Sequence, residues 1–275
     1  MPRISIILPT YNRVALLPRA IQSVIDQSFT DWELIVVNDA STDTTDAVAR
    51  NFSLQDSRIR VITNVTNQYP DISKTLNIGC AEARGEYIAR LDDDDFWHDR
   101  DKLKVQIEFL DTHPECVLLG AGVIVIDAEG KERTRYQKPE SDAEIRATAL
   151  LVNPFAHTTV MYRASAARQV GWYSNIHYAE DWDLWLKLGT VGKMGNLQRY
   201  TTSYLQAGQN KSLMHLWPHT RNIFAIITTH RKQYPHALRA YLITTLQYTY
   251  ALLIPLPLRA KLQPIAATFK RSLFG

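Results

Sequence analysis

A run of four aspartates constrains the fold of this chain more than any other feature of the sequence. The run, Asp92–Asp95, directly follows the apolar segment Tyr87–Leu91, whose bulky side chains suit a short buried strand. Four adjacent carboxylates cannot all be buried and ionised, because desolvation and mutual repulsion would each cost several kcal/mol. We therefore expect the run to lie at the exit of the strand, where it faces water or a cation.

The acidic run has two interpretations. Ligands of an open α/β sheet bind outside the carboxyl ends of its strands. Mg²⁺ and Mn²⁺ prefer carboxylate, water and phosphate oxygens, so a run of acids at that edge suits a divalent cation. Taken alone, however, a run of like charges is more typical of a solvated turn. The rest of the chain has to decide between the two.

Strand patterns alternate with helix patterns along the N-terminal part of the chain. The predicted strands are Ile4–Leu8, Glu33–Val37, Ile59–Ile62 and Tyr87–Leu91, and the predicted helices are Leu16–Gln27, Asp43–Arg50, Lys74–Ala83 and Asp99–Asp111. This alternation predicts an α/β fold with a doubly wound, mostly parallel sheet flanked by helices. No G-x-G-x-x-G motif follows the first strand, which argues against a dinucleotide fold of the usual kind.

The middle of the chain continues with shorter patterns. We expect a strand or a bent pair at Cys116–Gly120 and Val123–Ile126, a helix at Ser141–Leu151, a strand at His157–Tyr162, and helices at Ala164–Val170 and Glu180–Leu188. Gly171 follows the first of the last two helices and suits its C-terminal cap.

Length and cysteine content narrow the class of protein. A chain of 275 residues with 45% hydrophobic residues can form one large domain, or one domain with an appendage. Cys80 and Cys116 have no metal-ligand spacing and are expected to be reduced and buried, which fits the cytoplasm. Met1–Arg3 leads directly into the first predicted strand, so we expect no signal peptide.

Charge is distributed unevenly along the sequence. From Leu184 to Gly275 there are twelve Lys or Arg residues and no Asp or Glu, whereas the first 183 residues hold the other 19 basic and all 28 acidic residues. This split suggests an anionic partner for the C-terminal part. Nucleic acid and the anionic cytoplasmic face of a membrane are both candidates.

The uncharged segment Ala240–Leu258 has three interpretations. Its 19 residues approach the length of a membrane span, but polar residues and two prolines interrupt it. A segment lying on a membrane surface therefore suits it better than a span, and a helix packed on the rest of the protein suits it equally well. We expect a domain boundary after residue 212, with a basic helical extension over residues 213–275.

Several segments, taken in order, resemble the inverting glycosyltransferases of family 2, which use the GT-A fold. The segments are Ser5–Arg13, Glu33–Ser41, Asn77–Gly79 with Gly85–Ile88, Asp92–Asp95, Val170–Tyr173 and Glu180–Leu184. Each segment alone is weak, and the resemblance comes from their order and spacing. It implies a nucleoside diphosphate sugar as donor and Mg²⁺ or Mn²⁺ as cofactor, with UDP-sugars the commonest donors in the family.

The resemblance also assigns roles to individual residues. In the family, the loop after the first strand cradles the nucleotide, and this role falls to Pro9, Thr10, Tyr11 and Asn12. Asp39 matches the acid that accepts a hydrogen bond from the base of the nucleotide. A carboxylate suits an imide N–H, because such charge-assisted bonds are short and strong.

Within the acidic run, Asp92 and Asp94 match the family's metal motif, which spaces two acids by one residue. Asp94 is the expected direct metal ligand, while Asp92 and Asp93 lie near the ribose and the diphosphate; the register stays open by one residue. The metal would neutralise charge on the leaving nucleoside diphosphate. Asp181 matches the catalytic base, which removes a proton from the acceptor hydroxyl, with Glu180 as its neighbour or substitute.

Each of these roles has a structural alternative. Asp39 can instead cap the helix that follows it, and Asp181 can be an acid stabilised near a helix N-terminus. Trp182 and Trp185 are more typical of a core than of a sugar platform. His157 is either structural or close to the acceptor, and we assign it no role.

Two departures from the family pattern bear on function. Family members often place an Arg and a His after the base helix, near the diphosphate, but Tyr204–Ser212 has only Lys211. The Q-x-x-R-W motif of processive polysaccharide synthases is also absent, which favours transfer of a single sugar. The resemblance thus implies transfer to a glycan or lipid-linked acceptor in cell-surface polysaccharide synthesis. The basic C-terminal part suggests that this occurs peripherally at the cytoplasmic membrane face.

Two other functions fit parts of the sequence. A nucleotidyltransferase that makes activated sugars would share the fold, but it needs a glycine-rich loop after the first strand, and Pro9–Arg13 has no glycine. A nucleic-acid binding module would use the basic C-terminal part, but it leaves the acidic run and Asp181 unexplained. We therefore expect no nucleic-acid partner.

Overall fold

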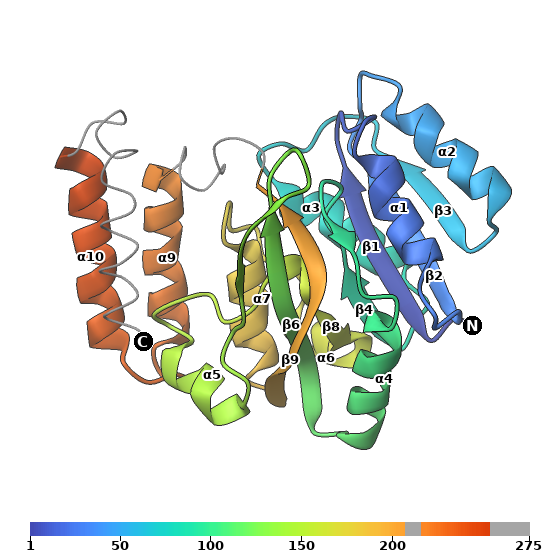
Figure 1. Cartoon of the computed structure of the whole chain (residues 1–275). Coiled ribbons are helices and arrows are strands. Elements are labelled where there is room, and N and C mark those ends of the chain that lie inside the picture. The colour runs from blue at the N-terminus through green and yellow to red at the C-terminus, as the bar shows by residue number, and fades with distance from the viewer. Residues whose placement is uncertain (207–215, 254–275) are drawn as a thin grey trace.

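The computed structural model of the chain describes residues 1–206 and 216–253. A central sheet forms the middle layer, and helices cover both of its faces (Figure 1). The N-terminal elements are β1 (Ile4–Thr10), α1 (Leu17–Ile25), β2 (Trp32–Asn38), α2 (Thr45–Gln55), β3 (Ile59–Thr63), α3 (Ile72–Glu82), β4 (Tyr87–Arg90), β5 (Phe96–Trp97) and α4 (Lys102–Thr112). Apart from β5, these elements lie where the sequence predicts them.

The first four strands form a parallel sheet. Their order is β3-β2-β1-β4, so β1 lies between β2 and β4, with Ile4 opposite both Trp32 and Tyr87. Parallel strands joined by crossover helices have all their carboxyl ends at one edge of the sheet. The loops that follow β1, β2 and β4 therefore meet at this edge.

Side chains of β1 alternate between the two faces of the sheet. Ile6 and Leu8 belong to the same core cluster as Ile21 of α1, whereas Ile7 packs in the cluster that contains Leu76 of α3. All five side chains are buried. Because both faces are covered, the strand is an unbroken apolar run in the sequence.

The C-terminal elements extend the sheet with mixed pairing. They are β6 (Cys116–Ile126), β7 (Glu132–Tyr136), α5 (Asp142–Thr148), the 3₁₀ turn η1 (His157–Thr159), β8 (Met161–Arg163), α6 (Ala164–Val170), α7 (Glu180–Leu188), β9 (Lys193–Leu205), α9 (Leu216–His230) and α10 (Ala237–Leu253). From β4 the sheet continues in the order β8-β6-β9-β5, and β7 pairs with β6. Because β8 is antiparallel to both β4 and β6, β6 runs in the same direction as β4.

One predicted strand is wrong in its first half. His157–Thr159 form the 3₁₀ turn η1, and the strand begins only at Met161. The turn places Thr158 against the acidic run, where its hydroxyl lies 3.4 Å from the Asp92 backbone nitrogen. A weak alternation of polar and apolar residues does not distinguish such a turn from a strand.

Helices α9 and α10 pack beside the sheet, one after the other, as Figure 1 shows at its left. His230 of α9 and Asp183 of α7 are both buried, and Nε2 and Oδ1 form a hydrogen bond of 2.8 Å. The rings of Phe224 in α9 and Tyr241 in α10 stack. Within the two described ranges, no helix combines the length and hydrophobicity needed to cross a membrane. Residues 254–258 of the uncharged segment lie outside the described residues.

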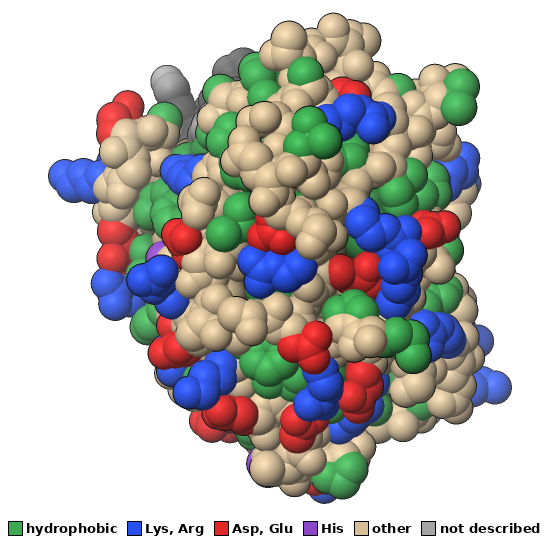
Figure 2. Space-filling view, turned by 90° about the vertical axis from the view of Figure 1, so that its right-hand side faces the viewer, with side chains coloured by type: hydrophobic (Ala, Val, Ile, Leu, Met, Phe, Trp, Pro, Cys, Tyr) green, Lys and Arg blue, Asp and Glu red, His purple; other side chains and the backbone are tan. Residues whose placement is uncertain are grey.

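The N-terminal half carries both signs of charge on its surface. On the face that Figure 2 shows, Asp and Glu side chains lie between Lys and Arg side chains. Arg50 pairs with Asp46 in this half, and Arg60 pairs with both Glu33 and Glu82. Exposed ion pairs of this kind add little stability.

Candidate active site

The acidic run leaves β4 at the carboxyl edge of the sheet. Arg90, the last residue of β4, is buried and donates a hydrogen bond of 2.7 Å from Nη2 to Asp92 Oδ1. The side chains of Asp92 and Asp94 are each 35% exposed. These two acids therefore lie where the sequence predicts them, at the strand exit and in contact with solvent.

Asp93 is tied to the loop after β1. The Tyr11 N–H donates to Asp93 Oδ2 at 3.3 Å, and Arg13 Nε lies 3.4 Å from Asp93 Oδ1. The Arg13 guanidinium also reaches Asp94, with Nη2 3.7 Å from Oδ2. Burial and the charge of Asp94 raise the pKa of Asp93 to about 6.

Asp95 does not face water as expected. It is fully buried, and its Oδ1 accepts the Leu205 N–H at 3.0 Å. Burial and the charges of Asp92 and Asp94 raise its pKa well above the ordinary range of an aspartate, which favours the protonated form. The protein thus avoids burying four ionised carboxylates, because three remain partly exposed and the fourth takes up a proton more readily.

The loop after β1 joins the acidic run to the loop after β2. Asn12 has a φ of 51°, a left-handed conformation that asparagine tolerates. Its side chain accepts the Thr42 N–H at 2.8 Å and donates to the Thr42 hydroxyl at 3.1 Å. Pro9 and Thr10 are buried, whereas Tyr11 is exposed. Of the four residues expected to cradle the nucleotide, Tyr11 presents the most side chain to solvent.

Asp39 lies after β2 and is buried. Its carboxylate accepts hydrogen bonds from Asn64 Nδ2 at 2.6 Å and from the Gln68 N–H at 3.0 Å. The N-cap position of α2 belongs to Thr44, so Asp39 is not the cap of that helix. Its position at the carboxyl edge leaves the predicted contact with a base as the interpretation to test.

Asp181 lies in the first turn of α7. Asn153 Nδ2 donates to its Oδ2 at 2.8 Å, and the Trp182 N–H donates to its Oδ1 at 2.7 Å. Burial raises the pKa of Asp181, and the charge of Asp92 adds to this rise. Burial and the charge of Asp181 raise the pKa of the neighbouring Glu180 to about 8.

The structure brings the acidic run and the start of α7 together. Asp92 acts electrostatically on both Glu180 and Asp181, and the positive charge of Arg90 acts on Glu180. These groups are therefore close enough to influence one another's charge at the carboxyl edge of the sheet. The loop after β1 contacts the same acidic run through the hydrogen bond from the Tyr11 N–H to Asp93.

Sequence reasoning assigned no role to three side chains of this site. Arg13 is the last residue of a segment that carried the family resemblance, and Arg90 lies between two such segments. An arginine at the end of an apolar strand, such as Arg90, was a usable signal. Asn153 lies in a loop with no pattern of its own, and its contact with Asp181 spans 28 positions of sequence. No local signal indicated it.

The tryptophans of α7 belong to the core, as predicted. Trp182 Nε1 donates to the Ala149 carbonyl at 2.7 Å, and Trp185 is fully buried. His157 Nε2 lies 2.9 Å from the Tyr173 hydroxyl. Burial lowers the pKa of His157 to about 3, so it is a neutral hydrogen-bonding group rather than a charged one.

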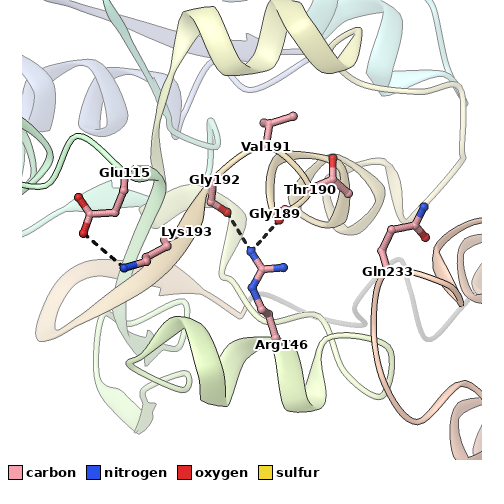
Figure 3. Close-up of a pocket in the computed structure, with 8 residues that line it drawn as sticks. All are labelled: Glu115, Arg146, Gly189, Thr190, Val191, Gly192, Lys193 and Gln233. Carbon is pink, nitrogen blue, oxygen red and sulfur yellow. Dashed lines mark hydrogen bonds and ion pairs between the residues drawn. The ribbon is translucent and has the colours of Figure 1, made fainter.

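A pocket of about 540 Å³ lies away from this site (Figure 3). Glu115 precedes β6 and Lys193 begins β9, which places the pocket at the amino edge of the sheet. Its cations are already engaged: Arg146 donates to the carbonyls of Gly189 and Gly192, and Lys193 pairs with Glu115. The contacts in this pocket are structural.

A metal ion at the acidic run would have few protein ligands. Within residues 1–206 and 216–253, no three His, Cys, Asp or Glu side chains are grouped to hold a metal ion. Asp92 and Asp94 offer partly exposed carboxylates. Two carboxylates fit Mg²⁺ or a similar ion that completes its coordination with water and substrate phosphates.

Comparison with known proteins identifies the family. The family model described as "Glycosyl transferase family 2" matches residues 5–171. The chain belongs to glycosyl transferase family 2. This family 2 protein is therefore a glycosyltransferase, as the order of its sequence motifs indicated.

Two relatives cover most of this family 2 chain. The putative glycosyltransferase EpsE of Bacillus subtilis (strain 168) is 37% identical over 202 residues, which cover 72% of this chain and 70% of EpsE. The amylovoran biosynthesis glycosyltransferase AmsE of Erwinia amylovora is 29% identical over 191 residues, which cover 68% of this chain and 70% of AmsE.

Solved structures show the same GT-A fold. S. aureus TarS 1–349 in complex with UDP-GlcNAc superimposes with a TM-score of 0.69 at 19% identity, over 96% of this chain and 78% of TarS 1–349. The mannosyltransferase PcManGT from Pyrobaculum calidifontis, in complex with GDP-Man and Mn²⁺, gives a TM-score of 0.66 at 16% identity, over 97% of this chain and 80% of PcManGT. The predicted fold class is confirmed.

Proposed function

We propose that this family 2 enzyme is a metal-dependent inverting glycosyltransferase that moves one sugar from a UDP-sugar to a glycan or lipid-linked acceptor in cell-surface polysaccharide synthesis. The observation that carries the proposal is the meeting of two carboxylate groups at one sheet edge. Asp92, beside Asp94, raises the pKa of Asp181 on α7. Asp92 and Asp94 suit a metal ion, and Asp181 suits a catalytic base.

The donor nucleotide fits the edge between the loops after β1 and β2. Tyr11 offers an exposed ring on which a base can stack. The Asp39 oxygens already accept hydrogen bonds from Asn64 and Gln68, and a carboxylate oxygen can accept a second one. Related structures contain UDP, UDP-GlcNAc or GDP-Man, and UDP-sugars are the commonest donors in the family.

Asp94 and Asp92 are the residues that would hold Mg²⁺ or Mn²⁺. When bound, the ion supplies a positive charge that stabilises the leaving nucleoside diphosphate. Arg13 lies 3.7 Å from Asp94 and adds a cation at the same place. This matters because Tyr204–Ser212 lacks the Arg and His of other family members, and Lys211 lies outside the described residues.

Asp181 removes the acceptor proton in this mechanism while the hydroxyl attacks the anomeric carbon from the face opposite the diphosphate. Its raised pKa makes it a better base than an exposed aspartate. Glu180, with a pKa of about 8, keeps its proton at neutral pH. We therefore assign the base role to Asp181 and not to Glu180.

A donor screen with the full chain tests the proposal. Nucleoside diphosphate release is measured with a panel of nucleotide sugars, with and without Mn²⁺. Asp94→Asn is expected to lose the metal-dependent rate, and Asp181→Asn to lower kcat by about 10²- to 10⁴-fold. Asp31→Asn, an exposed aspartate with the same chemical change, is the control. Activity that survives both site substitutions would contradict the assignment. Release of pyrophosphate from a nucleoside triphosphate and a sugar 1-phosphate, offered in a separate assay, would indicate nucleotidyl transfer instead.

The site of action is proposed to be an anionic membrane surface. Every ionisable acid lies before Leu184, and the C-terminal part carries twelve basic residues. Leucines 238, 242 and 246 of α10 are exposed. Apolar side chains beside cations suit the interface of an anionic bilayer, where a lipid-linked acceptor would be found. AmsE, the relative named for amylovoran biosynthesis, supports a polysaccharide acceptor.

A further inference from the structure

Asp181 is held in place by an amide side chain. Asn153, from the loop between α5 and η1, donates from Nδ2 to Asp181 Oδ2 at 2.8 Å. The Trp182 N–H donates to the other oxygen at 2.7 Å. Among the described residues, each oxygen is given one hydrogen bond, and a carboxylate oxygen can accept a second. The carboxylate is thus fixed and still able to accept a proton.

Other contacts determine which way the Asn153 amide points. Its Oδ1 accepts the Phe155 N–H at 3.2 Å, so the oxygen must be on that side and the NH₂ group on the side of Asp181. Lys138, which follows β7, donates from Nζ to the Asn153 backbone carbonyl at 2.8 Å. Asn153, which donates the hydrogen bond to Asp181, is therefore held in place through both its side chain and its main chain.

We propose that Asn153 is the positioning residue of the catalytic base: its amide fixes the orientation of the Asp181 carboxylate, and Lys138 holds the Asn153 main chain in place. This inference rests on the proposed role of Asp181 as the base. A catalytic base acts efficiently only when it is held in one geometry relative to the substrate. A neighbouring group that orients the base is therefore a recurring part of such sites.

Opposing effects determine the pKa of Asp181, and Asn153 is among those that lower it. Burial raises the pKa of Asp181 and Asp92 raises it further, whereas the hydrogen bonds from Asn153 and the Trp182 N–H, and the charge of Lys138, lower it. Glu180 on the same helix and Tyr173 before it also interact with this carboxylate. Without Asn153 the balance moves toward the protonated form, which is inactive as a base.

The test compares kcat of the full chain across pH, at saturating donor, for the wild type and Asn153→Asp. Aspartate keeps the shape of asparagine and the contact with the Phe155 N–H, but it replaces the donor with a like charge. The midpoint of the acid limb of the profile is expected to shift to higher pH by about one unit or more. At pH values below this midpoint, kcat is expected to fall by about tenfold or more. The donor KM is expected to stay within about twofold.

Three further variants complete the test. Asn153→Ala removes the donor without adding charge and should shift the limb in the same direction by less. Lys138→Met should give a smaller shift of the same sign. Asn51→Asp, an exposed position on α2 with the same change of charge, should leave the limb in place. If Asn153→Asp fails to fold, as judged by circular dichroism, the other two site variants provide the same readout.

The outcomes separate this inference from the proposed function. If Asp181→Asn retains full activity, the base assignment fails and this inference fails with it. If Asp181→Asn is inactive but neither Asn153 variant moves the acid limb, Asn153 only shapes its loop and this inference alone is overturned. A change confined to the donor KM would also overturn it, because a positioning residue of the base acts on kcat.

Discussion

A single buried lysine is expected to make the stability of this enzyme depend on pH. Lys102 at the start of α4 is fully buried, donates to Gln106 Oε1 at 2.7 Å and lies 4.1 Å from the centre of the Trp97 ring. Burial lowers the pKa of Lys102 to about 7 from an ordinary value of 10.5. Between these two values the unfolded chain binds a proton that the folded chain does not.

The free energy of unfolding is therefore expected to increase as the pH rises from 7 toward 10, by up to about 1.4 kcal/mol per pH unit from this residue alone. Lys102→Met, which keeps the length of the side chain, should flatten that slope, as measured by urea denaturation at several pH values. Lys104→Met, on the exposed side of the same helix, should leave it unchanged. Equal slopes for the wild type and Lys102→Met would show that the ammonium stays charged in the folded protein.

The position of a candidate side chain in the fold was predictable where a segment carried the family resemblance, but its environment was not predictable where a distant partner determines it. Asp92 and Asp94 lie at the strand exit and Asp181 lies near the start of a helix, as predicted, but the burial of Asp95 was not predicted. That burial depends on Leu205, a partner 110 positions away. Asn153 was missed for the same reason. Local patterns contain residue types and spacing, while the protonation and orientation of a side chain depend on the groups that tertiary structure places around it.

Gly85, which precedes β4 and belongs to a segment that carried the family resemblance, is a point of close packing between elements. A Cβ there would lie 2.5 Å from the Ser5 backbone nitrogen and 2.8 Å from the Ile4 carbonyl carbon. Backbone atoms of β1 cannot move aside as a flexible side chain can. Gly85→Ala is therefore expected to destabilise the protein by about 2–3 kcal/mol through overpacking, measured by chemical denaturation. Gly195→Ala in β9, where the nearest atom is an ordinary 3.4 Å away, should change stability much less, and similar losses in both would contradict the explanation.

The strand β9 shows why part of the fold escaped prediction. It has 13 residues and pairs with both β6 and β5, yet its sequence has no regular alternation. Register shifts against β6 between Ala121 and Val123 interrupt the period of two, and irregular pairing of this kind turns side chains to the other face. The buried parallel strands were predictable because both of their faces are covered and their residues form unbroken apolar runs.

The entire chain combines two electrostatically different parts. On the face that Figure 2 shows, side chains of both charges are interspersed, whereas no residue after Asp183 is acidic. Within α10, Ala240 and Thr244 are buried, and the helix packs on α9. Leu238, Leu242 and Leu246 recur every four residues and share the exposed side. This side joins apolar surface to a region without negative charge, as expected of a surface that contacts anionic lipid.

The enzyme is therefore expected to sediment with vesicles that contain anionic phospholipid, and less with purely zwitterionic vesicles. Rising salt should weaken binding through screening. Leu242→Gln with Leu246→Gln should weaken it by about a hundredfold or more, because each leucine fully buried in the interface contributes about 1.5–3 kcal/mol. Leu54→Gln, an exposed leucine on α2 that is 86% accessible, is the matched control.

Unchanged binding of the double variant would contradict a membrane role for α10. A concentration-dependent dimer that the same double variant abolishes, measured by light scattering without lipid, would assign this side of α10 to a second copy of the chain.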